Sequence, residues 1–182
     1  MFISDYGITG NCRSSALISK NGSVDWCCLP NFDSPSVFAR LLDDENGGHF
    51  SINPEGNYSV LQNYILNTNI LRTEFVSDEA SFEIIDFMPV YRPDETSYYN
   101  APELYRLLRV RRGEPVIRIE YRPSLNYGSP TKGILNKNYI KHVSTEGRYE
   151  SIYLYTDINW DLVLDGGSFS LKNNCFFCIS YN

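Results

Sequence analysis

The sequence predicts an all-β fold, an antiparallel β-sandwich with one short helix. Several short runs alternate apolar and polar residues with a period of two, and glycine-containing turn signals separate these runs. The 14 tyrosines and 10 phenylalanines supply most of the aromatic residues, and such residues favour half-buried pleated surfaces. Many short strands divided by turns are typical of a two-layer sandwich, and 182 residues suit one domain of ordinary size.

The first expected element is a β-hairpin near the N-terminus. Residues 16–20 and 23–26 are predicted to be its two strands, with Asn21-Gly22 between them. Asn-Gly is the strongest short hairpin signal, because both turn positions are expected to take positive φ.

The single helix is expected next. Ser34 is placed to cap it, Pro35 suits its first position, and Gly47-Gly48 ends it. The predicted apolar stripe of this helix consists of Val37, Phe38, Leu41 and Leu42.

Further strands are expected along the rest of the chain. In residues 116–122 the apolar positions Ile117, Ile119 and Tyr121 share one face, and the charged positions share the other. Gly113-Glu114 predicts a second hairpin that joins strands at 104–112 and 115–122. The remaining predicted strands cover residues 81–84, 149–156 and 176–182.

The composition makes several classes of function unfavourable. A formal charge of −6 repels a phosphate backbone, so we expect no nucleic-acid partner. The densest basic group is interpreted as a solvated sheet face rather than an anion site; it comprises Arg106, Arg109, Arg111 and Arg112. The N-terminal residues form no secretory signal and no apolar run reaches membrane-spanning length, so we expect a cytoplasmic protein without membrane contact.

The cysteines and histidines predict no metal and no cofactor. Five cysteines form a poor disulfide framework, and Cys175 and Cys178 are expected on opposite faces of a strand. Neither a second C-x-x-C motif nor paired histidines complete a tetrahedral site. The expected role of these thiols is that of small buried side chains.

No catalytic residue is assigned in this chain. Glycoside hydrolysis needs two carboxyl groups on either side of the scissile bond, and no spacing in the sequence selects such a pair. The candidates on composition alone are Asp25, Asp33, Asp43, Asp44, Glu45 and Asp86.

The N-terminal part carries a dense series of motifs. Residues 6–13 read YGITGNCR, and residues 21–38 read NGSVDWCCLPNFDSPSVF. Residues 64–75 read YILNTNILRTEF, and residues 85–89 read IDFMP. In this order the motifs resemble the N-terminal domain of glycoside hydrolase family 15, the glucoamylase and trehalase-like family, with departures at Cys28 and Asn31.

The resemblance implies that catalysis belongs to a separate domain. The family's N-terminal domain is an antiparallel β-sandwich that packs on a C-terminal (α/α)₆ barrel, and the barrel carries both catalytic glutamates. Residues 1–182 are therefore expected to be the non-catalytic N-terminal domain of an inverting α-glucosidase acting on α-glucans or trehalose. The expected partner is the catalytic barrel of the same polypeptide, absent from this chain, and the chain alone is expected to be inactive.

Residues 25–38 have two interpretations. In the first, Trp26 and Phe32 fill the sandwich core, and Ser34 caps the helix. In the second, this segment reaches the rim of the barrel's substrate cleft or the domain interface, through Arg13, Asp25, Trp26, Phe32 and Asp33. Two alternatives for the whole chain also remain, namely a carbohydrate-binding module for α-glucans and an interaction domain that holds a homo-oligomer together.

Overall fold

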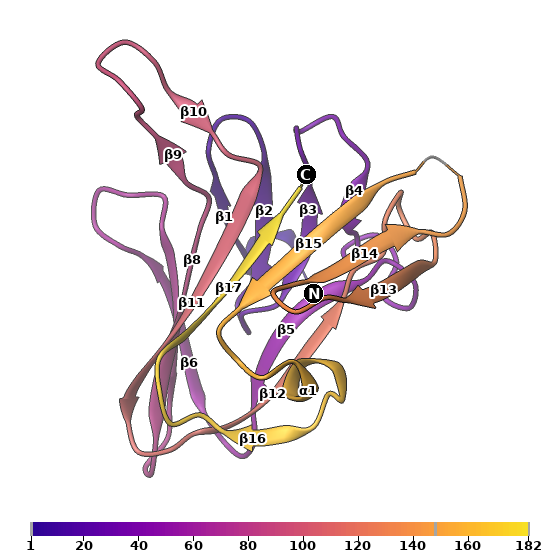
Figure 1. Cartoon of the computed structure of the whole chain (residues 1–182). Helices are drawn as coiled ribbons and strands as arrows, with labels where there is room; N and C mark the ends of the chain where they lie inside the picture. Colours follow the sequence, from indigo (N-terminus) through magenta and orange to yellow (C-terminus); the bar gives the residue numbers. More distant parts are fainter. Residues whose placement is uncertain (1, 148, 182) are drawn as a thin grey trace.

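The computed structural model describes residues 2–147 and 149–181 and contains two antiparallel sheets that lie face to face (Figure 1). Met1, Arg148 and Asn182 lie outside the described residues, and so does the last position of the strand predicted at 176–182. Sheet A runs in the order β1-β2-β3-β5-β12-β16, and β4 pairs with β3. Its strands are β1 (Tyr6–Gly10), β2 (Ser15–Ser19), β3 (Val24–Cys28), β4 (Ser36–Phe38), β5 (His49–Pro54), β12 (Val116–Arg122) and β16 (Ser168–Ser170).

Sheet B runs in the order β13-β14-β15-β17-β11-β8-β7-β6. Its strands are β6 (Ser59–Tyr64), β7 (Leu71–Val76), β8 (Ser81–Phe87), β11 (Glu103–Arg112), β13 (Thr131–Leu135), β14 (Ile140–Ser144), β15 (Ser151–Thr156) and β17 (Cys175–Ser180). A separate ribbon of β9 (Val90–Tyr91) and β10 (Tyr99–Asn100) projects from one end of the sandwich (Figure 1). The two short helical elements are the 3₁₀ turn η1 (Ile3–Asp5) and the helix α1 (Trp160–Leu164).

Side chains from both sheets meet in one continuous apolar core. Phe50 of sheet A and Phe177 of sheet B are fully buried, and their rings contact edge to face with centroids 5.3 Å apart. Ile117 and Ile119 also point into this core from β12, as the two-residue alternation predicts. The predicted β-sandwich is confirmed.

A charged side chain lies at the centre of this core. The Arg106 side chain on β11 is fully buried, and its Nε donates a hydrogen bond to Oδ1 of Asp86 on β8 at 2.8 Å. The same guanidinium donates to two backbone carbonyls of sheet A, those of Phe50 at 2.7 Å and Gly22. Arg106 therefore links the two sheets through a paired and hydrogen-bonded charge, which is the condition under which a core tolerates one.

The interpretation of Arg106 as part of a solvated sheet face is wrong. Leu104, Arg106 and Leu108 alternate along β11, and all three are buried toward the core. Arg109, Arg111 and Arg112 are exposed, as that interpretation requires. Arg109 and Arg111 both contact Glu83, whereas Arg112 donates to the carbonyls of Ser77 and Asp78.

The first predicted hairpin is confirmed as β2 and β3, but its turn differs in detail. Gly22 has a φ of +78°, whereas Asn21 is not among the residues with positive φ. The amide of Gly22 donates to the Ser19 carbonyl, and the amide of Ser19 donates to the Ser23 carbonyl. These bonds describe a three-residue loop with glycine at the left-handed position, which requires positive φ only once.

The second predicted hairpin is wrong in its pairing, although both strands exist. β11 pairs with β8 and β17 in sheet B, whereas β12 pairs with β5 and β16 in sheet A. The turn at Gly113, with a φ of +64°, carries the chain from one sheet to the other. A turn signal marks the end of a strand but does not determine which strand becomes its neighbour.

The helix predicted from Ser34 is also wrong. Ser36, Val37 and Phe38 form β4 and are all buried, and Phe38 pairs with Cys27 of β3. The Ser34 hydroxyl accepts a hydrogen bond from the Asn31 amide and caps no helix. Burial at the sheet outweighs the helical spacing of these apolar residues, as tertiary contacts commonly outweigh local propensity.

The short helix of the fold lies elsewhere, at α1. Asn159 caps it, because its side-chain oxygen accepts a hydrogen bond from the Asp161 amide at 3.0 Å. Val163 is its one buried residue within the described chain. A helix of five residues with one buried position shows no apolar periodicity from which the sequence could predict it.

Because His142 on β14 is largely buried, we expect the protein to become less stable in acid. Burial lowers the pKa of His142 to about 4, and the ring packs edge to face on Tyr121 at 5.4 Å. Between its ordinary pKa of 6.5 and about 4, the unfolded chain binds a proton that the folded chain does not. The stabilisation by neutral His142 should therefore be complete above pH 6.5, and the free energy of unfolding should fall by about 3 kcal/mol as the pH decreases toward 4.

Urea unfolding midpoints at pH 7 and pH 4.5 measure this effect. His142→Gln should reduce the difference between the two midpoints, because glutamine binds no proton in either state. An unchanged difference in the variant would show that other groups govern the acid transition.

Candidate functional site

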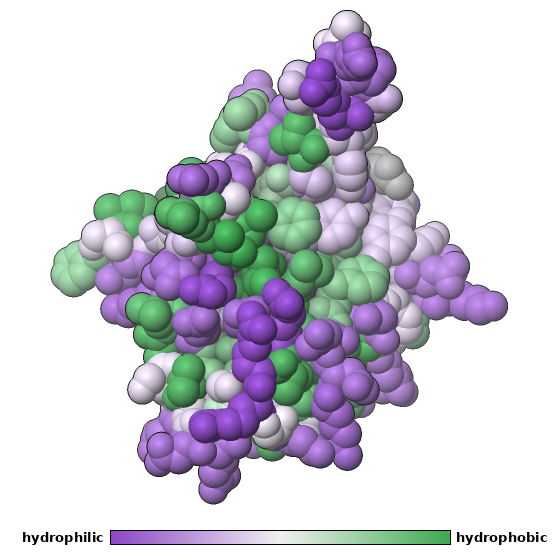
Figure 2. All heavy atoms as spheres, turned by 90° about the vertical axis from the view of Figure 1, so that its left-hand side faces the viewer, coloured by the Kyte–Doolittle hydropathy of each residue, from purple (hydrophilic) through white to green (hydrophobic). Residues whose placement is uncertain are grey.

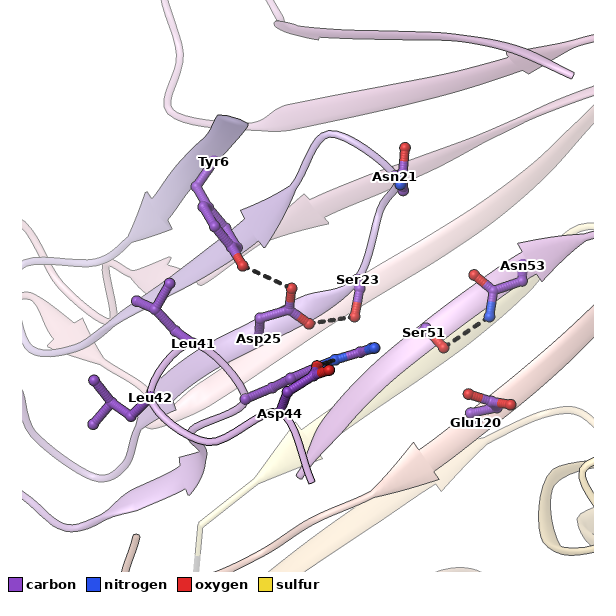
Figure 3. Close-up of a pocket in the computed structure, with 11 residues that line it drawn as sticks. Tyr6, Asn21, Ser23, Asp25, Leu41, Leu42, Asp44, Ser51, Asn53 and Glu120 are labelled. Atoms are coloured by element: carbon purple, nitrogen blue, oxygen red, sulfur yellow. Dashed lines mark hydrogen bonds and ion pairs between the residues drawn. The ribbon is translucent and has the colours of Figure 1, made fainter. Parts of the chain in front are cut away.

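A polar concavity of about 580 Å³ opens on the outer face of sheet A (Figure 3). Its floor is formed by three neighbouring strands, since Asp25 lies on β3, Ser51 and Asn53 lie on β5, and Glu120 lies on β12. We call this concavity the sheet A pocket. Its rim consists of Tyr6, Asn21, Ser23, Arg40, Leu41, Leu42 and Asp44.

Asp25 is the most enclosed carboxylate of the pocket, with 4% of its surface exposed. It accepts hydrogen bonds from the Tyr6 hydroxyl at 3.0 Å and from the Ser23 hydroxyl at 2.5 Å. Burial, together with the neighbouring Asp25 charge, raises the pKa of Tyr6 to about 12. Tyr6 therefore remains a neutral hydrogen-bond donor at physiological pH.

The other two carboxylates also have partners of their own. Asp44 accepts from Arg40 Nε at 2.8 Å, and this bond lowers the pKa of Asp44. Glu120 lies 3.2 Å from Nε2 of His49. Burial acts to raise the pKa of Glu120, but the His49 bond and the Arg122 charge outweigh it, and the pKa is lowered.

This arrangement does not have the properties of a glycosidase acid pair. A general acid needs a raised pKa so that it still holds a proton at neutral pH. The pKa values of Asp44 and Glu120 are lowered instead, and Asp25 is already bonded to two hydroxyls. The chemistry that the pocket offers is hydrogen bonding rather than proton transfer.

A second group of motif residues meets at the end of the sandwich beside the β9–β10 ribbon. Arg13 Nε donates to Asn31 Oδ1 at 2.9 Å, and its Nη1 donates to the Asn100 carbonyl at 3.2 Å. The Phe32 amide donates to the Arg13 carbonyl at 3.0 Å. We call residues 11–13, 31–33 and 100–101 the loop cluster, since these bonds hold two loops and the end of β10 together.

The five predicted site residues do not converge on one site. Arg13 and Phe32 belong to the loop cluster, and the exposed Asp33 follows Phe32 in the same loop. Asp25 lies in the sheet A pocket, and Trp26 packs at 6.2 Å against the Tyr127 ring. Phe32 is 58% exposed, so the interpretation that it fills the core is wrong.

Several pocket residues were not singled out from the sequence. Ser51 and Glu120 are direct partners in the β5–β12 ladder, although 69 positions separate them in the chain. Glu120 belongs to the polar face that alternation identifies in residues 116–122, which was the one available signal. Tyr6, Asn21 and Asn53 carry no local pattern that relates them to each other.

The described residues contain neither a group of metal-ligand side chains nor a helix that could span a membrane. No three histidine, cysteine, aspartate or glutamate side chains gather there as metal ligands. No helix within residues 2–147 and 149–181 is both long and apolar enough to cross a membrane. Cys175 and Cys178 are unpaired thiols, and burial raises the pKa of each to about 12.

The fold and the site together define a class of protein, a β-sandwich domain with an open polar pocket and a loop cluster. Residues 2–172 match the family described as "Trehalase-like, N-terminal". The chain belongs to this family, as the resemblance of its motifs implies.

The curated relatives are longer proteins. The chain is 39% identical to the trehalase of Thermoplasma volcanium and 36% identical to trehalase 2 of Sulfolobus acidocaldarius. These matches cover 73% and 71% of this chain but only 21% and 20% of the relatives. Trehalase 1 of Sulfolobus acidocaldarius is 49% identical over 46% of the chain. The chain thus spans about a fifth of the length of these relatives, and no solved structure matches it significantly.

Proposed function

We propose that this chain is the non-catalytic N-terminal domain of a trehalase-like α-glucosidase that cleaves trehalose or starch-like oligosaccharides by inversion. The observation that carries this proposal is the match over residues 2–172, together with relatives named trehalase whose remaining length lies outside it. The catalytic barrel of the same polypeptide is the partner of this domain. The domain braces the barrel and shapes one side of its cleft.

An exposed apolar side of the sandwich supports the bracing role. Apolar residues gather on the side of the molecule that Figure 2 shows, below the polar tip of the β9–β10 ribbon. They come in part from β6 and the loop that follows it, and they include Val60, Leu61, Tyr64, Ile65 and Leu66. An exposed apolar area of this kind is typical of a surface that another domain covers.

The loop cluster is the part of the domain proposed to face the substrate cleft. Its hydrogen bonds hold Phe32 at the end of the sandwich with 58% of its surface exposed. A rigid, exposed aromatic ring beside polar groups suits contact with a sugar or with the domain that holds it. Arg13 and Asp33 supply the polar groups there, whereas Trp26 supports the segment from the side of Tyr127.

The five unpaired cysteines support a cytoplasmic location for the proposed enzyme. All five are free thiols. Cys27, Cys28 and Cys178 are buried. Proteins of oxidising compartments commonly pair their cysteines, whereas reducing compartments keep them as thiols.

A chimera tests the proposal. Residues 2–172 would replace the matching N-terminal segment of the Thermoplasma volcanium trehalase, and glucose release from trehalose and maltose would be measured. We expect the chimera to hydrolyse trehalose and the 182-residue chain alone to release no glucose. Hydrolysis by the isolated chain would contradict the proposal, and so would a folded chimera without activity.

The same chimera tests the loop cluster. Phe32→Ala should lower kcat/KM about tenfold, the ratio expected when one aromatic contact worth about 1.4 kcal/mol is lost. Leu135→Ala, at a side chain 52% exposed on β13, is the matched control and should leave kcat/KM unchanged. Equal values of kcat/KM in the two variants would show that Phe32 does not lie at the rim of the cleft.

A further inference from the structure

The sheet A pocket combines features that suit a small hydroxylated ligand. Its volume of about 580 Å³ lies within the range of about 300–1,000 Å³ that is typical of ligand pockets. Its floor is formed by hydrogen-bonded strands of sheet A. Asp25 and Ser51 on the floor and Ser23 at the rim are almost completely buried. We propose that the sheet A pocket binds a neutral pyranose sugar.

Unused hydrogen-bonding groups point to this ligand class. The Asn53 amide nitrogen donates to Ser51 Oγ at 3.0 Å, which leaves its carbonyl oxygen unbonded within the described residues. The Asn21 side chain makes no hydrogen bond to any described residue, and one oxygen of Glu120 is likewise unbonded there. An asparagine side chain offers both a donor and an acceptor, and an ionised glutamate offers acceptors, so these groups can bond to neighbouring hydroxyls of a sugar ring.

The charges of the pocket argue against an anionic ligand and against a simple cation. Three carboxylates and one guanidinium line the pocket, so its net charge is negative and it repels phosphates and carboxylates. Each carboxylate already accepts from an internal donor, namely Tyr6 and Ser23 for Asp25, Arg40 for Asp44, and His49 for Glu120. What remains is hydrogen-bonding capacity, which a neutral polyhydroxylated ring uses better than an ion does.

The two ends of the pocket differ in polarity. Tyr6, Leu41 and Leu42 lie at one end, and Asn53 and Glu120 lie at the other (Figure 3). A pyranose ring has both an apolar C–H face and polar hydroxyl edges. It can therefore pack against the first group and bond to the second.

A titration of the 182-residue chain tests this proposal. Backbone amide NMR shifts would be followed with glucose, maltose and trehalose, and with glycerol as an acyclic hydroxylated control. We expect saturable shifts at the backbone amides of Asn21, Asp25, Ser51 and Asn53 with at least one sugar, and weaker shifts with glycerol. Binding here does not depend on hydrolysis, so failure of this titration and failure of the chimera are separate results.

Variants locate the binding within the pocket. Asn53→Ala and Asn21→Ala should each weaken the sugar about fivefold, the ratio for one lost neutral hydrogen bond. Asn136→Ala, at an exposed asparagine beside β13, is the matched control and should bind as the unsubstituted chain does. Amide spectra of each variant would show that the fold is intact.

Several results would overturn the proposal. These are the absence of saturable shifts with every sugar, shifts that map to another surface, and equal shifts with glycerol. An unchanged affinity in both pocket variants, or saturable binding of putrescine without binding of any sugar, would equally exclude a pyranose site.

Discussion

Replacement of Arg106 by methionine is expected to lower the free energy of unfolding by about 3–5 kcal/mol. The substitution leaves the Asp86 carboxylate buried without its cation, because Arg106 Nε at 2.8 Å is its ion-pair partner. It also removes the donors to the Phe50 and Gly22 carbonyls, which connect sheet B to sheet A. Urea unfolding followed by tryptophan fluorescence measures the loss.

A double variant separates the charge from the packing. Arg106→Met combined with Asp86→Leu should recover part of the lost stability, since no uncompensated charge then remains in the core. Arg112→Met, at an exposed arginine of the same strand, should change stability by less than about 0.5 kcal/mol. A loss for Arg106→Met as small as that of Arg112→Met would show that the central ion pair does not hold the sheets together.

Replacement of Gly48 by alanine is expected to cost about 3 kcal/mol or more. Gly48 has a φ of +71°, and a Cβ at this position would overlap the Arg122 carbonyl oxygen and lie 2.8 Å from the Ser124 amide nitrogen. The Arg122 oxygen and the Ser124 nitrogen are backbone atoms at and just after the end of β12. The steric clash with the new Cβ can therefore be removed only if β5 and β12 move apart. Thermal and urea unfolding of the variant measure the cost.

Gly56 provides the matched control for backbone strain. Its φ is +93°, and a Cβ there would meet no atom within 4 Å. Gly56→Ala should therefore cost only the strain of the left-handed conformation, about 1 kcal/mol. Similar losses in both variants would show that strain alone, and not the close approach of Gly48 to β12, accounts for the effect.

Local pattern was sufficient to predict some of the strands and the first hairpin. The alternation in residues 116–122 correctly separated the core positions Ile117 and Ile119 from the outer position Glu120. Asn21-Gly22 correctly marked the connection of β2 to β3. These features depend on residues within a few positions of each other, so the chain itself contains the information.

Helical spacing misled the prediction for residues 34–42. Val37 and Phe38 are compatible with either a helical stripe or a short strand, and their burial against β3 selected the strand. Gly47 and Gly48 were expected to end a helix. Instead, Gly47 and Gly48 accept hydrogen bonds from the Ala39 and Arg40 amides and so close a loop.

The candidate site was predictable only in fragments. Arg13, Asp25, Trp26, Phe32 and Asp33 were chosen because they lie close together in the motifs, but the structure divides them among the loop cluster, the sheet A pocket and the Tyr127 contact. Neighbouring residues of a strand point to opposite faces of the sheet. In addition, a bulge in β3 near Asp25 alters the direction of the side chains there.

The sequence by itself determined the family of this chain, its all-β class and the position of several strands, among them β2, β3, β8, β11, β12, β15 and β17, because motifs and two-residue periodicity are local properties. Only the tertiary structure decided that β11 and β12 belong to different sheets, that Arg106 meets Asp86 inside the core, and that Asp25 shares a pocket with Glu120. The physical reason is that strand pairing joins residues far apart in the chain. Such pairs are selected by the packing of the whole sandwich and by the burial of complementary polar groups, and no local pattern records that selection.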